Sequence, residues 1–358
     1  MIATILAPLI WLAAATRLYR WWWTRSGVLA AAALALSVVA LHLTLNIPAV
    51  ERLVQEIAPV TNFSTAIRMV LFNFMAAAVG GLVLALTMRS AQHRVLWWAR
   101  AFVATAVVGA VVALAIFLNA TQQPQVAGGF EFDQAYAHLP GYAEAGIAGA
   151  IFPALLCPVL SAMTARAADS TTLTGWSLAL LATGLTAASV WAWIRLCYLL
   201  GARYAQWPPS PLVFDITRAV AGIGTFIVFL GMMLPMVAGW VHAQHIRYRI
   251  APLHRMLLDR HPGARRPSRT GATAPERAGD RVSEMLDALS VELAVAELPA
   301  AGSTAPADVI AGEVAEFLVG GTASAVLSHE SLRAATDQVT ADQWAVLVSR
   351  AYQERMNE

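Results

Sequence analysis

The chain has 358 residues, of which 58% are apolar and 13% are charged, and its formal net charge is +2 at pH 7. These values exclude an ordinary soluble domain, in which about 45–50% of residues are apolar and about 25% are charged. All 24 basic residues are arginine, so a retinal Schiff base, which forms on lysine, is excluded. We therefore predict an all-α polytopic membrane protein, and we expect it to use no cofactor.

Seven apolar stretches follow one another along the chain, each near the length of about 20 residues that a helix needs to cross a bilayer. A cleaved signal peptide is the alternative for the first stretch. No basic residue precedes that stretch, however, whereas Arg17, Arg20 and Arg25 follow it, and this order favours a spanning helix. The predicted spans are residues 2–16, 27–46, 66–88, 99–118, 146–165, 175–200 and 216–241.

Arginines in the loops between these spans indicate the topology, because arginine is retained on the cytoplasmic side of a membrane. The longest of the opposite loops, 119–146, contains acidic residues and no arginine. We therefore predict seven spans, with the amino terminus outside and the carboxyl terminus inside. The arginines that support this orientation are Arg17, Arg20, Arg25, Arg89, Arg94, Arg100 and Arg166.

The composition changes after residues 1–243, the predicted transmembrane bundle. Residues 244–268 are strongly basic, and Arg247, Arg249 and Arg255 belong to this segment. Its apolar residues recur at helical spacing, so we predict an amphipathic juxtamembrane helix that lies on the inner leaflet and binds anionic lipids. The alternative is that these arginines are ordinary cytoplasmic flanking charges with no lipid role. The apolar residues of the stripe are Ile246, Ile250, Leu253, Leu257 and Leu258.

Residues 269–279 have the composition of a linker, and residues 280–358 form three amphipathic segments. Thr340 and Gln343 have the spacing of a capping box at the start of the third segment. The resulting acidic, helical cytoplasmic domain is small, so we expect it to bind an unknown cytoplasmic protein or to form a homodimer. It lacks a basic recognition helix, and we expect no nucleic-acid binding.

Seven spans followed by RYRIAPLHRMLLDRHP and then by RVSEMLDAL resemble a group of uncharacterised actinobacterial membrane proteins. Members of this group are often named as transporters and end in a domain of unknown function. The resemblance covers nearly the full length and matches at Arg281, Glu284 and Asp287, but His254 stands where the group has tryptophan. The resemblance implies this architecture and a bacterial plasma membrane, and it supplies no established catalytic or binding residues.

Arg195 lies in the apolar run VWAWIRLCYLLG, where an unpaired guanidinium is costly. The topology places it near the outer end of the sixth span, close to Arg68, Asp215 and Arg218. Two or three arginines around one aspartate leave surplus positive charge, which predicts a site for an anionic ligand. The alternative is a structural ion pair between Arg195 and Asp215, with Arg68 and Arg218 flanking helix ends.

Proline and glycine residues mark positions at which two spans are expected to bend. Pro153 and Pro158 in the fifth span, and Pro235 in the seventh, remove backbone donors, and Gly231 adds a flexible position. We predict hinges at these four residues, although a static bundle also tolerates them.

Motifs typical of catalysis and metal binding are missing from the sequence. We find no phosphate-binding glycine loop, no HExxH, no CxxC and no nucleophile elbow, so we do not expect an enzyme. His242 and His245 have no nearby third ligand, so no metal site is predicted.

Two functions remain open from the sequence. The first is a seven-helix sensor that couples an outer pocket to the cytoplasmic domain, and the second is a small-molecule transporter or permease. A transporter requires polar groups near the middle of the membrane, and Asn73 is the main one among the predicted spans. The scarcity of such groups favours the sensor.

Overall fold

The computed structural model describes residues 2–58, 60–88, 92–126, 128–267, 272–295, 298, 305–320 and 326–357. The described chain is built from α-helices and one short 3-10 helix, with no strand in these ranges. It divides into two compact units, unit 1 (Met1–Pro235) and unit 2 (Met236–Glu358). Arg89 and residues 269–271 of the predicted linker lie outside the described residues.

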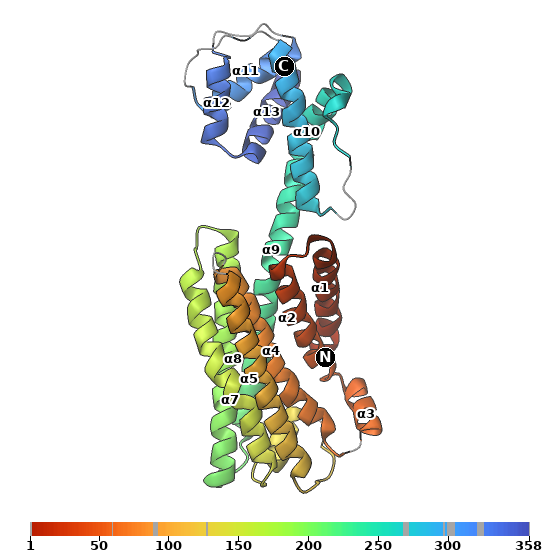
Figure 1. The fold of residues 1–358 in the computed structure, drawn as a ribbon, viewed down its shortest axis with the longest axis vertical. Helices are drawn as coiled ribbons and strands as arrows, with labels where there is room; N and C mark the ends of the chain where they lie inside the picture. The colour runs from red at the N-terminus through yellow and green to blue at the C-terminus, as the bar shows by residue number, and fades with distance from the viewer. Residues whose placement is uncertain are drawn as a thin grey trace. The chain divides into compact units, whose positions relative to one another are not determined.

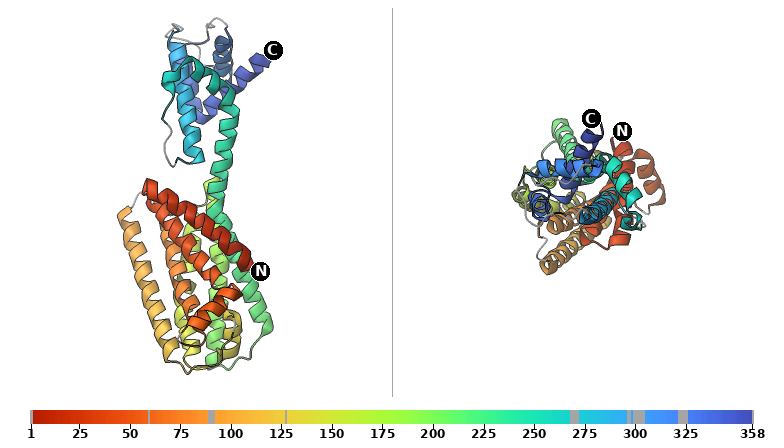
Figure 2. Two further views of the ribbon diagram at one scale, coloured as in Figure 1. Left: turned by 90° about the vertical axis from the view of Figure 1, so that its right-hand side faces the viewer. Right: turned by 90° about the horizontal axis from the view of Figure 1, so that it is seen from above.

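Unit 1 is a bundle of long helices with a short helix in each of two connections (Figure 1). The helix α1 packs along α2, and both views show the two side by side (Figures 1 and 2). Only the first part of the last long helix, α9, belongs to this unit. The helices are α1 (Ile2–Thr24), α2 (Gly27–Thr44), α3 (Pro48–Ile57), α4 (Phe63–Thr87), α5 (Gln92–Asn119), α6 (Gly129–Tyr136), α7 (Tyr142–Ala167), α8 (Leu173–Tyr204) and α9 (Pro211–Arg260).

Six helices of the described chain are long and apolar enough to cross a membrane, namely α2, α4, α5, α7, α8 and α9. The predicted fold class is therefore confirmed as an all-helical protein with several candidate membrane spans. The first predicted span falls in α1, which is not among the six. A seventh span at α1 and the orientation of the bundle stay predictions.

The helix α4 is the centre of unit 1, packing against α2, α5 and α7. In its most apolar stretch 67% of the residues are buried, compared with 22% in α5. Small residues permit this close packing, since a Cβ on Gly80 would lie 2.9 Å from the Phe102 ring. Asn73 ties α4 to α7, because its side-chain amide donates to the Gly149 carbonyl at 3.0 Å. Its buried position therefore has a structural explanation.

The helices α8 and α9 also approach each other closely. A Cβ on Gly231 would lie 2.9 Å from the Leu181 amide nitrogen and 3.1 Å from the Ser177 carbonyl oxygen. The Ser177 hydroxyl donates a hydrogen bond to the Gly231 carbonyl. Gly231 therefore serves as a contact point between two backbones, which is a packing role that the sequence prediction of a hinge did not include.

Unit 2 is a second, smaller helical assembly around the last part of α9. The apolar stripe of α9 and the inner faces of the other helices share one hydrophobic core that includes Met285, Val314 and Trp344. The capping box is present, with the Thr340 amide donating to Gln343 Oε1 at 3.1 Å and the Gln343 amide to Thr340 Oγ1 at 3.4 Å. The elements that follow α9 are η1 (Pro262–Ala264), α10 (Ala274–Val295), α11 (Ala307–Val319), α12 (His329–Gln338) and α13 (Ala341–Asn357).

The prediction of a separate, lipid-facing helix at 244–268 is wrong for its apolar face. This segment continues α9 without a break as far as Arg260. Its stripe residues Ile250, Leu253 and Leu257 are fully buried in the core of unit 2, so they cannot insert into lipid. Periodicity showed that the helix is amphipathic, but a helix partner and a lipid surface bury the same pattern. An interaction of the exposed Arg249 and Arg255 with lipid head groups stays a prediction.

Candidate functional site

At one end of unit 1, the two short helices and the first turn of α7 supply acidic side chains to arginines on the long helices. Glu51 lies on α3, Glu131 and Asp133 lie on α6, and Glu144 lies in the first turn of α7. At this end α2 and α8 end, and α4, α7 and α9 begin. The arginines near these helix ends therefore lie close enough to the acidic side chains to form ion pairs. The ion pairs are Arg68–Glu51 at 2.9 Å, Arg195–Asp133 at 2.7 Å, Arg203–Glu144 at 2.7 Å and Arg218–Glu131 at 2.8 Å.

Arg195 forms a two-point contact with Asp133. Its Nε donates to Asp133 Oδ2 at 2.7 Å and its second guanidinium nitrogen donates to Oδ1 at 3.1 Å. Only 12% of the Arg195 side chain and 7% of the Asp133 side chain are exposed. The predicted pairing of Arg195 with Asp215 is wrong, because Asp215 is 73% exposed and contacts Arg218 at 3.8 Å. Helix α6, which lies 62 residues earlier in the chain, supplies the partner.

Arg68 is buried beside Glu51, and part of its hydrogen-bonding capacity is unused. One terminal nitrogen donates to Glu51 Oε1 at 2.9 Å and to the Leu45 carbonyl at 2.8 Å. Glu51 Oε1 also accepts from the Gly128 amide at 2.9 Å. The positive φ of 87° at Gly128 suits glycine, and a Cβ there would collide with the Glu131 carboxylate. The Nε and NH1 of Arg68 are buried without a partner among the residues that the structure describes.

A cavity of about 640 Å³ lies beside these ion pairs. We call it the outer cavity because it lies at the end of unit 1 that the predicted topology places outside, and its volume is typical of small-molecule sites. Its lining comes from α1, α2, α3, α4, α6, α8 and α9, together with the turn between α2 and α3 and the loop before α6. The lining residues are Ala3, Leu6, His42, Leu43, Asn46, Glu51, Thr65, Arg68, Met69, Phe72, Gly128, Gly129, Phe130, Glu131, Asp133, Trp191, Arg195, Arg218, Ala221, Gly222 and Thr225.

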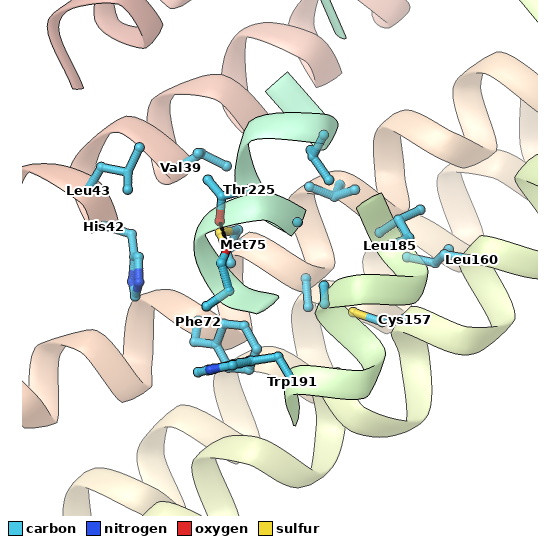
Figure 3. Close-up of a pocket in the computed structure, with 16 residues that line it drawn as sticks. Val39, His42, Leu43, Phe72, Met75, Cys157, Leu160, Leu185, Trp191 and Thr225 are labelled. Carbon is cyan, nitrogen blue, oxygen red and sulfur yellow. Dashed lines mark hydrogen bonds between the residues drawn. The ribbon is translucent and has the colours of Figure 1, made fainter. Parts of the chain in front are cut away.

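A second cavity of about 100 Å³, which we call the inner cavity, is drawn in Figure 3, and it adjoins the outer cavity because the two share lining residues. The edge-to-face pair of Phe72 and Trp191, with ring centroids 4.6 Å apart, lies at the junction. Beyond it the walls are nearly all apolar, as Leu160 and Leu185 illustrate in Figure 3. Six residues line both cavities, namely His42, Leu43, Phe72, Trp191, Ala221 and Thr225.

Four residues of the outer cavity carry buried polar atoms that have no hydrogen-bond partner in the described part of the chain. They are His42 Nδ1, Thr65 Oγ1, Arg68 Nε and NH1, and Trp191 Nε1. A buried donor that lacks an acceptor costs about 1–3 kcal/mol, and such groups are few in native proteins. Their gathering at one cavity therefore marks it as the best candidate for a ligand site in the described chain.

The lining of the outer cavity has no surplus charge. Arg68, Arg195 and Arg218 each contact a carboxylate that also lines the cavity. The prediction of surplus positive charge is therefore wrong, since it counted Asp215 as the sole acid. The three predicted arginines do line one cavity, whereas Asp215 does not.

The predicted hinge residues lie in continuous helices. Pro153 and Pro158 are inside α7, and α9 continues through Gly231 and Pro235. Pro235 is the last residue of unit 1, so the boundary between the two units in the sequence falls directly after a predicted hinge residue. Whether these residues bend in function stays a prediction.

The charge pattern of the sequence indicates some of the site residues that were not predicted. Glu131 and Asp133 lie in a predicted outer loop without arginine, and four acids in the connections face four helical arginines. Matching these charges would have suggested the pairs, although not their order. Trp191 and Thr65 have no such indication, because an aromatic or a hydroxyl residue in a span is normally packing.

Histidines of unit 2 pair with acids. His254 contacts Glu284 at 2.8 Å, His261 contacts Glu292, and His242 lies 4.0 Å from Asp342. Among the described residues, no three His, Cys, Asp or Glu side chains gather in a group that could hold a metal ion.

The apolar helices of unit 1 identify the chain as a multi-pass helical membrane protein. Its candidate site is a cavity with balanced charges and unpaired donors. Comparison of the chain with protein-family models, curated proteins and solved structures found no match. The resemblance to actinobacterial membrane proteins therefore stays a prediction, and functional inference depends on the cavity.

Proposed function

We propose that the protein is a seven-helix sensor of a bacterial plasma membrane that couples an outward-facing cavity to its cytoplasmic helical unit. One observation carries the proposal. The helix α9 lines the outer cavity at Arg218, Ala221 and Thr225 and continues to Arg260. Further along the same helix, Ile250 and Leu253 lie in the core of unit 2. A ligand that shifts α9 therefore acts on an element that unit 2 needs for its own packing.

The burial pattern of α1 supports a role for it as the seventh span. Ala7 and Ile10 are fully buried, whereas Ile5 and Leu12 on the other face are 57% and 64% exposed. A helix that is apolar on all sides is typical of a membrane span. Leu6 of α1 also lines the outer cavity, so α1 completes the wall of the site.

A transporter is the alternative. A polar solute would need polar groups along a continuous path through the bundle. The donors of the outer cavity end at Trp191, and the inner cavity beyond it is lined mainly by apolar side chains. This arrangement favours a dead-end binding site and hence the sensor.

Filling the cavity without a ligand tests the coupling. In Ala221→Trp, the indole occupies space at the junction of the two cavities, and we expect altered amide hydrogen exchange in α10. Ile223→Trp is the matched control, since Ile223 is 60% exposed and lines neither cavity. Equal exchange in α10 for both variants and the unchanged chain would contradict the sensor. Solute flux through liposomes containing the unchanged chain would support the transporter.

A further inference from the structure

We propose that the outer cavity binds an uncharged amphipathic molecule whose head group presents acceptor oxygens, such as an ester, and whose apolar chain enters the inner cavity. The ligand class, which rests on the proposed function, follows from three properties of the site. These are the charge of the lining, the chemistry of its unpaired atoms and the apolar cavity behind them.

The charges of the outer cavity leave no counter-ion for an anionic head. Arg68 is paired with Glu51, and Arg195 is paired at two points with Asp133. A carboxylate or phosphate head would bring negative charge next to Glu51 and Asp133. A charge in a partly dry site is costly unless it is paired. A cationic head has the same difficulty, because each carboxylate is already engaged by an arginine. The head group is therefore uncharged.

Apart from His42 Nδ1, which donates or accepts according to its tautomer, the unpaired atoms of the outer cavity are donors and require acceptors. Arg68 Nε and NH1 and Trp191 Nε1 can only donate hydrogen bonds, and Thr65 Oγ1 can donate one. Arg68 is 6% exposed and Thr65 is 1% exposed, so both are more than nine-tenths buried. Glu51 Oε1 already accepts from Arg68, Gly128 and Ser64. Ester or ether oxygens satisfy such donors without adding charge.

The apolar inner cavity can hold the apolar chain of the proposed ligand. It begins at the Phe72–Trp191 pair, and its walls include Val39, Leu160 and Leu185 (Figure 3). A polar molecule confined to the outer cavity would leave this space unused. An apolar chain placed there is removed from water, which is favourable in proportion to the area buried. The two cavities together therefore match a head and a tail.

Photo-crosslinking on the full chain tests the proposal. The probe is monodecanoylglycerol carrying a diazirine in its acyl chain, and the crosslinked peptides are mapped by mass spectrometry. We expect crosslinks in α4, α8 and α9. Unlabelled monodecanoylglycerol should compete at least about tenfold better than decanoate or decylamine, which have similar chains but charged heads. Glycerol alone should not compete.

Two substitutions remove a donor without breaking any hydrogen bond inside the protein. Thr65→Val and Trp191→Phe should each weaken probe binding by about fivefold, the value of one hydrogen bond. Thr183→Val and Trp193→Phe are the matched controls on α8, where both residues are exposed and line neither cavity. These controls should bind the probe like the unchanged chain.

Each outcome bears on the ligand class. Stronger competition by decanoate than by monodecanoylglycerol would overturn the uncharged head. Crosslinks outside the cavity, or equal binding by Thr65→Val and its control, would overturn the site. Competition by a diacylglycerol, which is uncharged and carries ester oxygens, would support the class and identify the bilayer as the source, whereas competition by phosphatidylcholine, whose head carries a phosphate, would overturn the uncharged head. If the probe does not bind but Ala221→Trp changes amide hydrogen exchange in α10, the ligand class is rejected and the proposed sensor function is still supported.

Discussion

Arg195 and Asp133, 62 residues apart, form a two-point ion pair with both side chains largely buried. The pair fixes α6 to α8 at the wall of the outer cavity. Removing one partner leaves the other charge buried and unpaired, which costs about 3–5 kcal/mol. We therefore predict that Asp133→Asn or Arg195→Gln strongly lowers the thermal unfolding midpoint of the detergent-solubilised chain. The matched control is Asp215→Asn, whose exposed carboxylate should matter little. Equal midpoints for Asp133→Asn and Asp215→Asn would show that the pair is dispensable.

The contact of α8 with α9 predicts different effects for two glycines of one helix. At Gly231 a Cβ would lie 2.9 Å from the Leu181 nitrogen, so Gly231→Ala must separate the helices and should cost about 1–3 kcal/mol. At Gly222 a Cβ meets no atom within 4 Å. Gly222→Ala should therefore be neutral or should stabilise α9 by up to about 1 kcal/mol. Chemical unfolding followed by circular dichroism measures both, and a reversed order would contradict the assigned packing.

The lowered pKa of Glu292 predicts that the stability of unit 2 depends on pH. The hydrogen bond with His261 is the main cause that lowers the pKa of Glu292, and Arg260 adds to it while burial opposes it. A lowered carboxyl pKa contributes stability that is complete above the unfolded value, about 4.3, and is lost as the pH falls through the folded value. The chain should therefore be more stable than Glu292→Gln above about pH 5, and this difference should shrink in more acidic solution. Thermal unfolding across this pH range measures the difference, and a gap that grows on acidification would contradict the assignment.

The proposed topology predicts which loops face outward. In a chain with Cys157 and Cys197 replaced by alanine, a membrane-impermeant maleimide should label Pro209→Cys on intact cells. Thr171→Cys, at the opposite end of α8, should react only after the cells are broken. Labelling of Thr171→Cys alone on intact cells would reverse the orientation.

The sequence predicted the helical membrane class and most span positions because apolar length is a local property. The span predicted at 175–200 corresponds to α8, Leu173–Tyr204. Prediction from the sequence fails at residues 244–268, where the apolar stripe that includes Ile250 and Leu253 packs in the core of unit 2 instead of against lipid. Period alone does not identify what covers an apolar face.

The site was predicted in part for a similar reason. Arg68, Arg195 and Arg218 stand out because charge is rare in spans, and all three line the outer cavity. Their partners are set by how α3 packs against α4 and how α6 packs against α4 and α7, and such tertiary contacts have no local sequence pattern. The nearest acid in sequence, Asp215, was therefore assigned to Arg195 in error.

Hydrogen exchange in α10 after addition of monodecanoylglycerol tests the central claim that occupancy of the cavity is transmitted along α9 to unit 2. With the site saturated, as judged by crosslinking, we predict changed exchange in α10 of the unchanged chain and of Thr183→Val. At the same concentration Thr65→Val should show a smaller change. Saturated crosslinking with no change of exchange in α10 would contradict the claim and leave a binding site that does not signal.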